Sequence, residues 1–425
     1  MAETFFVAFI AAIVVTPMAI KVAPRIGAMD IPKDGRRMHT TAMPRFGGIA
    51  ILAGIMVSLL LLSGEYKTVL ADLAAKSSRL IEHTSITDRD VAAAMLGCVL
   101  IYILGLADDL KNLKPVVKLA GQTACAVIVF AMGLRVEFIT NYFGPGNMML
   151  GDVACFIFTV LWLVGITNAV NLIDGLDGLA AGTSAISALC IGYVAYIHGQ
   201  YVPTFAMLAI AGGALGFLPY NFHPAKIFMG DGGSQLLGFA IAAFSILGTV
   251  KSATMVIVVI PALVLGLPIF DTAFAIVRRV VRHQPIGMAD KEHLHHRIMR
   301  AGFGQRRSVM LMYCISGIMG IVAVLYSRGF VIEYLGLIAV AIMLLYVLMS
   351  DTGNRNVSIR ASKIKHEKDI NTGEAPARTA DPESMTPEKT PDEVETADGE
   401  TAEKDDLQEN EQEQAEGEDE KENDK

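Results

Sequence analysis

The sequence predicts an all-α integral membrane protein that crosses the bilayer about eleven times. Of its 425 residues, 53% are hydrophobic and the mean hydropathy is +0.47, whereas a soluble domain averages roughly 45–50% apolar residues. Uninterrupted apolar runs follow one another, most of them near the ~20 residues that cross a bilayer as a helix. Most runs also lack the polar face that helices around a soluble core would present.

The predicted spans alternate with short polar connections. In chain order they are 4–22, 47–63, 91–107, 116–133, 153–170, 179–197, 203–220, 235–250, 254–274, 308–326 and 331–349. No basic segment of the kind that opens a signal peptide precedes the first run, so we expect that run to be retained as a span.

The distribution of Lys and Arg predicts the orientation. The connections after odd-numbered spans hold 18 of these residues, and those after even-numbered spans hold 7. Short cytoplasmic loops carry the excess of positive residues. We therefore expect the odd-numbered connections and the C-terminus to be cytoplasmic, and the N-terminus to lie outside.

The charge divides the chain into two parts. From Asp351 onward there are 24 acidic and 10 basic residues, so this segment carries −14 and the remainder carries +6. The segment also lacks Phe, Trp and Tyr, and it cannot bury enough apolar surface to offset its ordering entropy. We predict a membrane-embedded domain over 1–350 and a disordered acidic cytoplasmic tail over 351–425.

Two adjacent carboxylates, Asp108 and Asp109, end the third span, and Asn112 and Lys118 follow them. Acidic groups at a helix C-terminus oppose the macrodipole, so this placement costs stability. Two close like charges also push their titrations apart, which suits acid–base chemistry or metal binding. An ordinary charged surface loop explains the pair equally well.

The connection after the fifth span carries Asn171, Asp174 and Asp177. Two Asp-Gly steps three residues apart form tight turns that aim both carboxylates at one place. Polar groups at membrane depth are costly unless they are satisfied or used. A plain turn needs only one such step, so a functional role is favoured here.

Glycines surround candidate residues on two further connections. Asp231 follows Gly230 and precedes two more glycines, so it could approach a ligand closely, with helix-terminal amides as an anion cradle. The same four residues also form a common turn. In the basic first connection Arg45 precedes Gly47-Gly48, which alone indicates only a close approach of backbone or ligand.

The ninth connection gathers His293, His295, His296 and Arg297 within five residues. The adjacent histidines would not share one small ion comfortably, so contact with phosphate is favoured over zinc binding. A basic patch against anionic lipid head groups is the alternative.

Together these loops place carboxylates, amides, imidazoles and guanidiniums on one membrane face. Carboxylates hold Mg²⁺, which takes phosphate oxygens among its other ligands, and the cations would hold a diphosphate. The pattern predicts phosphoryl transfer between a cytoplasmic nucleotide and a membrane lipid, with no nucleic-acid partner.

At these residues the sequence resembles the bacterial polyprenyl-phosphate N-acetylhexosamine-1-phosphate transferases. The matching motifs cover about 30–310 in order and loop position: Asp108-Asp109, Asn171-Leu-Ile-Asp174-Gly-Leu-Asp177-Gly, Phe228-Met-Gly-Asp231-Gly-Gly-Ser and His293-Leu-His295-His296-Arg297. The resemblance implies a multi-pass protein of the bacterial inner membrane, with Mg²⁺ as cofactor and Mn²⁺ as an alternative. It also implies a UDP-sugar donor, an undecaprenyl-phosphate-like acceptor and UMP as product, and it allows a homodimer.

The resemblance further implies roles for individual residues. Asp231 looks like the principal metal ligand, Asp108 and Asp109 like a pair near the acceptor phosphate, and Lys118 like a diphosphate contact. The candidate catalytic residues are Asp108, Asp109, Asp174, Asp177, His295 and His296; the candidate substrate-binding residues are Lys118, Asn112, Asn171, His293, Arg297 and Gly230; and the candidate metal ligands are Asp231 and Asp174.

The order His-x-His-His-Arg resembles the branch of this family that uses UDP-N-acetylglucosamine. The favoured function is transfer of N-acetylglucosamine 1-phosphate to undecaprenyl phosphate, as the first membrane step of an envelope glycan such as a teichoic-acid linkage unit or O-antigen. Transfer of phospho-N-acetylmuramoyl-pentapeptide to the same lipid is the alternative. A secondary transporter is disfavoured because ionisable groups, Asp271 excepted, lie at span ends rather than at the bilayer midplane. A non-catalytic scaffold that displays the acidic tail is a third reading.

Overall fold

The computed structural model describes residues 1–31, 42–61, 88–140, 147–249, 262, 264–281, 294–300 and 302–330. All of them fall in one compact unit, Met1–Ile364. The last predicted span, 331–349, the first residues of the ninth and the acidic tail lie outside the described residues. The predicted division into 1–350 and 351–425 therefore stays a prediction.

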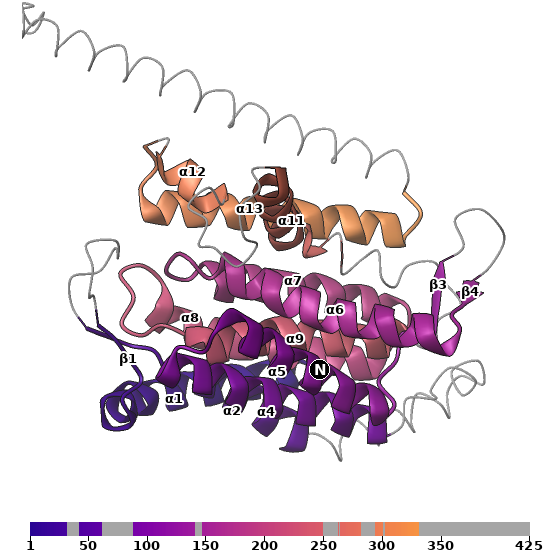
Figure 1. Ribbon diagram of the computed structural model, residues 1–425, viewed down its shortest axis with the longest axis horizontal. Helices are drawn as coiled ribbons and strands as arrows, with labels where there is room; N and C mark the ends of the chain where they lie inside the picture. The colour runs from indigo at the N-terminus through magenta and orange to yellow at the C-terminus, as the bar shows by residue number, and fades with distance from the viewer. Residues whose placement is uncertain are drawn as a thin grey trace, which may run out of the picture. The chain divides into compact units, whose positions relative to one another are not determined.

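Helices account for almost all of the described chain (Figure 1). Eight coincide with the first eight predicted spans: α1 (Ala2–Ile26), α2 (Gly48–Leu61), α4 (Asp88–Lys111), α5 (Pro115–Ala131), α6 (Asp152–Ile173), α7 (Leu179–Ile197), α8 (Tyr201–Asn221) and α9 (Gly230–Thr249). They are followed by α11 (Gly266–Val281), α12 (Leu294–Arg300) and α13 (Gln305–Ser327).

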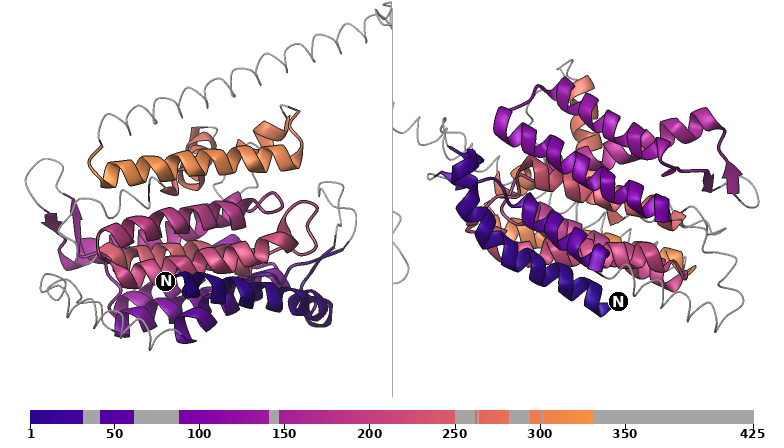
Figure 2. Two further views of the ribbon diagram at one scale, coloured as in Figure 1. Left: turned by 180° about the vertical axis from the view of Figure 1, so that it is seen from behind. Right: turned by 90° about the horizontal axis from the view of Figure 1, so that it is seen from below.

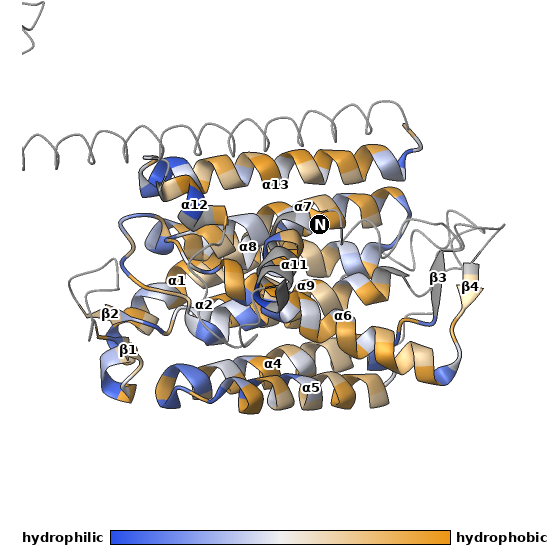
Figure 3. Ribbon diagram, turned by 45° about the horizontal axis from the view of Figure 1, so that its top comes forward, coloured by the Kyte–Doolittle hydropathy of each residue, from blue (hydrophilic) through white to orange (hydrophobic). Residues whose placement is uncertain are grey.

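Six of the described helices are long and apolar enough to cross a membrane, and α2 and α5 are shorter apolar helices. In Figure 3 the middle of α13 is hydrophobic and its ends are hydrophilic, as expected for a helix that spans a bilayer. A polytopic helical membrane protein is therefore confirmed. The count of eleven spans and the orientation stay predictions.

Two short antiparallel hairpins were not predicted. Strand β1 (Met29–Asp30) pairs with β2 (Met43–Pro44), and β3 (Phe138–Thr140) pairs with β4 (Asn147–Met149). In Figure 1 the first hairpin lies at the left end of the helices and the second at the right end. Both form where the chain leaves a helix and its backbone groups need new partners, so they change the connections and not the helical class.

The odd-numbered connections meet at one end of the bundle. Backbone N–H groups of Gly47 and Asp231 bond to Phe228 O and to the Asp109 carboxylate, which joins the first, third and seventh connections. Figure 1 places β1 and α12 at this same end. The described motifs of the first, third and seventh connections therefore lie together at one end of the bundle, and the membrane face on which they lie stays a prediction.

Helix α8 forms the centre of the bundle, where it packs against α1, α2, α7 and α9. Of its most apolar stretch 72% is buried, against 22% for α1. Gly212 and Gly216, one turn apart, let α1 approach so closely that an added Cβ would collide with Phe5 O and Phe9 O. Small residues at such a spacing are the usual way in which membrane helices pack. On the outer side of the bundle, α13 lies along α7 (Figure 2).

Replacing Gly216 by leucine is expected to separate α1 from α8 and to destabilise the fold by about 1–3 kcal/mol, because overpacking a close contact costs that much. The measurement is the thermal midpoint of the detergent-solubilised protein. Gly165→Leu on α6 is the matched control, since nothing lies within 4 Å of its added Cβ. Equal midpoints for the two variants would contradict the close contact.

Candidate active site

Lys118 lies at the centre of a polar cluster at the shared end of the bundle. Its Nζ lies 2.9 Å from Asp231 Oδ1 and 3.0 Å from Asp108 Oδ2. It also donates a hydrogen bond to Asn171 Oδ1 at 2.9 Å. These partners belong to α9, α4 and α6, so a single ammonium group on α5 joins the ends of four helices.

Asn171 uses both ends of its amide group in this cluster. While Oδ1 accepts from Lys118, Nδ2 donates to Asp231 Oδ1 at 2.7 Å and to Ser234 Oγ at 2.9 Å. The amide therefore fixes the carboxylate of Asp231 against the cation. Satisfying both ends of the amide offsets the cost of placing it at the end of an apolar helix.

A second layer of amides lies one helical turn deeper in the bundle. Asn168 Nδ2 donates to Gln122 Oε1 at 2.7 Å, and Gln122 Nε2 donates to Gln235 Oε1 at 2.9 Å. Both glutamines are buried. Because these amides come from α6, α5 and α9, they hold the same three helices in register that the site itself joins.

The adjacent carboxylates of α4 have different partners. Asp108 Oδ1 accepts the N–H of Leu113 at 2.8 Å, and its other oxygen faces the ammonium group described above. Asp109 faces α9, where Oδ1 accepts the N–H of Asp231 at 2.8 Å and Oδ2 that of Gly232 at 2.9 Å. The side chain of Asp109 is only 2% exposed.

Arg45 is held at the site by backbone pairing on both sides of β2. Its N–H donates to Ala28 O at 2.9 Å, and the preceding carbonyl of Pro44 accepts the N–H of Phe228 at 2.8 Å. The chain then enters α2 with Gly48 N–H donating to Met229 O at 3.0 Å. The first connection is thereby tied to the residues that immediately precede α9.

The guanidinium group of Arg45 lies between three carboxylates. It is 3.3 Å from Asp109 Oδ1, 3.7 Å from Asp231 Oδ2 and 3.9 Å from Asp30 Oδ1. One quarter of the side chain remains exposed. Arg45 is thus a second cation of the cluster. It was not predicted as a site residue, although its position before paired glycines was the available signal.

The turn between α6 and α7 is built around Gly178, which has φ +79°. Its N–H donates to Asn221 Oδ1 at 3.1 Å, and its carbonyl accepts the hydroxyl of Tyr313 at 2.6 Å. Next to it, Asp177 Oδ2 lies 2.8 Å from His223 Nδ1. The turn is therefore fastened to α8 and α13, and the carboxylate of Asp177 is directed to the seventh connection.

Asp174, which ends α6, differs from these carboxylates. Among the described residues no group forms a hydrogen bond or ion pair with its carboxylate. Burial, together with repulsion from Asp231, Asp109 and Asp177, raises the pKa of Asp174 to about 7 although Arg45 opposes the rise. A cation placed beside Asp174 would relieve this excess of negative charge.

The ninth connection reaches the site end through α12. Leu294 N–H donates to Asp271 Oδ1 at 2.9 Å, so Asp271 caps this short helix and is not an isolated charge. Arg297 is partly buried on α12. His293 lies outside the described residues, and the side chains of His295 and His296 are not described, so their predicted roles stay predictions.

The described residues contain no set of three His, Cys, Asp or Glu side chains arranged to hold a metal ion. Mg²⁺ needs less than this, because it is commonly held by one or two carboxylates with water and substrate phosphates as its other ligands. Asp174 and Asp231 repel each other at this site. This donor set fits Mg²⁺ bound together with a phosphate-bearing substrate.

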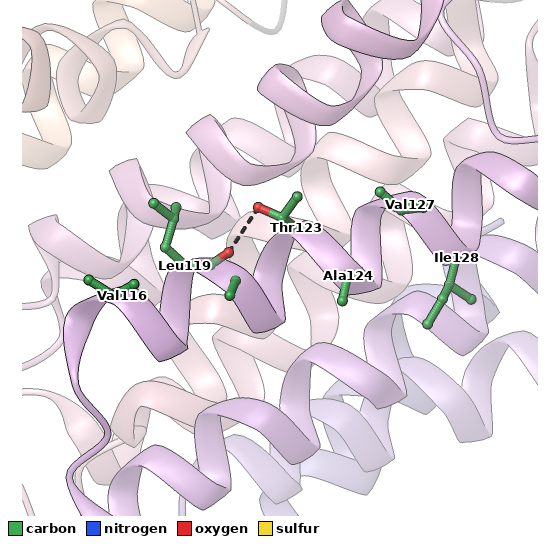
Figure 4. Close-up of a pocket in the computed structure, with 7 residues that line it drawn as sticks. Val116, Leu119, Thr123, Ala124, Val127 and Ile128 are labelled. Carbon is green, nitrogen blue, oxygen red and sulfur yellow. Dashed lines mark hydrogen bonds between the residues drawn. The ribbon is translucent and has the colours of Figure 1, made fainter.

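A groove of about 630 Å³ on α5 is separate from the cluster (Figure 4). It is lined by the apolar residues Val116, Leu119, Ala120, Ala124, Val127 and Ile128, and by Thr123. The hydroxyl of Thr123 donates to Leu119 O at 2.9 Å and needs no further partner. We interpret this face as the lipid-facing side of the helix.

The structure brings together most of the residues selected from sequence. Asp108, Asp109, Lys118, Asn171, Gly230 and Asp231 form one connected cluster, with Asp174 beside it. Asn112 is exposed and ends α4 with φ +50°, so in the structure it serves as a helix terminus. Arg45 and Ser234 were missed, and so was His223, whose ring pairs with Asp177.

Known proteins match this chain over most of its length. Residues 91–249 match the model of glycosyl transferase family 4. A probable undecaprenyl-phosphate N-acetylglucosaminyl 1-phosphate transferase of Bacillus subtilis (strain 168) is 40% identical over 82% of this chain and 91% of that protein. A decaprenyl-phosphate N-acetylglucosaminephosphotransferase of Mycobacterium tuberculosis (strain CDC 1551 / Oshkosh) is 34% identical over 70% of this chain and 75% of that protein. A phospho-N-acetylmuramoyl-pentapeptide-transferase of Bacillus cytotoxicus is 30% identical over 75% of this chain and 95% of that protein.

Proposed function

Since the chain belongs to glycosyl transferase family 4, we propose that it transfers N-acetylglucosamine 1-phosphate from UDP-N-acetylglucosamine to undecaprenyl phosphate and releases UMP. The observation that carries this proposal is the single cluster in which Lys118 joins Asp108, Asn171 and Asp231. Cations and carboxylates held together at the ends of apolar helices suit a diphosphate donor that meets a lipid phosphate.

Two observations favour N-acetylglucosamine over the muramoyl-pentapeptide as the sugar. The identity is 40% and 34% to the two relatives whose names specify N-acetylglucosamine, and 30% to the relative named for the muramoyl-pentapeptide. The His-x-His-His-Arg order at 293–297 points to the same donor. The secondary-transporter alternative is also weakened by Asp271, since its carboxylate caps α12.

The reaction that fits these residues is a single displacement. An oxygen of the lipid phosphate attacks the sugar-linked phosphorus, and the bond from that phosphorus to the bridging oxygen breaks, so UMP leaves with the electron pair. A phosphate monoester has a second pKa near ~6 and is mostly dianionic near neutral pH, so removal of a proton by a carboxylate would contribute little. The protein then acts chiefly by placement and electrostatics.

The residues divide this work between them. Lys118 and Arg45 supply positive charge for the transferred and leaving phosphates, and Asn171 fixes Asp231 for the metal. Asp231 and Asp174 would hold Mg²⁺, which would spread the negative charge that develops on the phosphate oxygens. Asp108 accepts a hydrogen bond on one carboxylate oxygen and faces Lys118 with the other, and Asp109 accepts hydrogen bonds on both oxygens. Because all four oxygens already have partners, a covalent aspartyl intermediate is disfavoured.

The site is proposed to face the cytoplasm of a bacterium. The described site residues come from odd-numbered connections, for which the sequence counts 18 Lys and Arg residues, against 7 in the even-numbered connections. Short cytoplasmic loops carry such an excess of positive residues. Nucleotide sugars are made in that compartment, so the donor would reach the site without crossing the bilayer.

The test is release of UMP by the purified protein with Mg²⁺ and undecaprenyl phosphate, with either UDP-N-acetylglucosamine or UDP-N-acetylmuramoyl-pentapeptide as donor. We expect UMP from the first donor only, and only when the lipid is present. UMP from the pentapeptide donor alone would reverse the assignment of the sugar, and none from either donor would end the proposal. A stoichiometric burst of UMP without lipid would replace the single displacement by a covalent intermediate.

A further inference from the structure

Asp109 serves as the N-terminal cap of a helix other than its own. The first residues of an α-helix have backbone N–H groups with no partner inside that helix. At α9 two of these, on Asp231 and Gly232, donate to the two carboxylate oxygens of Asp109 at 2.8 and 2.9 Å. A carboxylate at this end is also favoured by the helix macrodipole.

This contact explains why an acidic pair ends α4. At the C-terminus of its own helix, Asp109 opposes the macrodipole, which by itself costs stability. The N–H groups of α9 and the guanidinium of Arg45, 3.3 Å from Asp109 Oδ1, provide the compensation. The carboxylate is almost fully buried by these partners.

We propose that Asp109 is a positioning residue, which orients Asp231 toward the metal through its hydrogen bonds to the first turn of α9 and does not itself contact the lipid phosphate. Asp231 itself carries one of the two N–H groups that Asp109 caps. Any shift of this first turn of α9 therefore moves the carboxylate of Asp231. This inference rests on the proposed metal-dependent transfer, and it replaces the expectation that both carboxylates of the pair lie against the acceptor.

Gly230 provides an independent way to disturb the same contact. It has φ +73°, and an added Cβ would lie 2.5 Å from Asp109 Oδ2 and 3.0 Å from Arg45 O. A methyl group at this position would therefore push the cap away although the chemical groups of Asp109 and Asp231 are unchanged. If Asp109 acts by positioning, replacements at Asp109 and at Gly230 have coupled effects on metal binding by Asp231.

The experiment compares Asp109→Asn, Gly230→Ala and the double variant with the wild type. Binding of Mn²⁺, measured by its paramagnetic resonance signal in the full-length protein, reports the metal without turnover. We expect each single variant to weaken Mn²⁺ binding by about tenfold or more, and the double variant to do little further harm, because residues that share one contact are not additive. In turnover, kcat should fall while KM for undecaprenyl phosphate changes by less than about threefold.

Asp108→Asn is the comparison that separates the two members of the pair. Its carboxylate contacts Leu113 N–H and Lys118 and not α9, so Mn²⁺ binding should stay within about threefold of the wild type. Thermal midpoints of all variants distinguish a misfolded protein from a folded protein in which the carboxylate of Asp231 is displaced.

Three results would overturn the inference. The first is wild-type Mn²⁺ affinity in Asp109→Asn with KM for the lipid raised tenfold or more. The second is wild-type Mn²⁺ affinity and turnover in Gly230→Ala, and the third is no Mn²⁺ binding by the wild type. Failure of the proposed function would be seen separately, as absence of UMP release by a wild-type protein that still binds Mn²⁺.

Discussion

Replacing Asp231 by asparagine is expected to lower the rate of UMP release by about 10³-fold or more, the size of effect that follows loss of a metal ligand or of a charge-stabilising group at a phosphoryl-transfer site. Asparagine has nearly the same shape and can still accept the hydrogen bond from Asn171 Nδ2, which is 2.7 Å long. The negative charge that would hold Mg²⁺ is lost. Binding of Mn²⁺ should fall together with turnover.

Asp152→Asn is the matched control for this variant. Asp152 is exposed in the first turn of α6, at the opposite end of the helix from Asn171, so the same chemical change is made away from the cluster. Its turnover should equal that of the wild type. Near-normal UMP release by Asp231→Asn, with the protein inserted in the membrane, would remove Asp231 from the proposed metal site.

Replacing Lys118 by methionine is expected to reduce turnover by about 10²–10³-fold, because the ammonium group is the cation that faces both Asp108 and Asp231 and a charge-assisted contact to a diphosphate is among the stronger polar interactions. Metal binding should not fall as it does in Asp231→Asn. With the competing cation gone, Asp231 is more available, so the Mn²⁺ affinity should be retained or increased.

Lys111→Met is the control for Lys118→Met. Lys111 is exposed at the last turn of α4, on the same basic connection, and loses the same charge without leaving a carboxylate unpaired. We expect its turnover to stay within about threefold of the wild type, since exposed charges contribute little. Equal losses in the two variants would mean that Lys118 acts only through the overall positive charge of the loop.

Much of the fold could be predicted because apolar runs of bilayer length are a direct consequence of the hydrocarbon core, which admits only backbone that is hydrogen-bonded within its own segment. Helix α7 begins and ends at the residues predicted for the sixth span, 179–197. The two hairpins could not be predicted, since β1 and β2 are two residues each and form only because other backbone groups lie opposite them.

The sequence predicted most of the residues that make up the candidate site, but not the different contacts that each of them makes. Asp108 and Asp109 are identical in type and adjacent in sequence, so no local pattern separates them. Their side chains leave the last turn of α4 in different directions, one toward the ammonium of Lys118 and the other toward α9. Arg45 was missed because its partners Asp109 and Asp231 lie far along the chain.

The amino-acid sequence alone is enough to identify a helical membrane protein whose acidic, amide and basic motifs recur on alternate connections. Hydrophobicity and loop charge are local properties, so they can be recognised without knowing which residues are in contact. Which of those groups touch depends on the tertiary structure. It placed one lysine between three helices, turned one aspartate of an adjacent pair into the cap of α9 and left Asp174 without a hydrogen-bond or ion-pair partner among the described residues. The reason is physical: hydrogen bonds and ion pairs depend on distances of about 3 Å, which are set by how helices pack and not by the order of residues along any one of them.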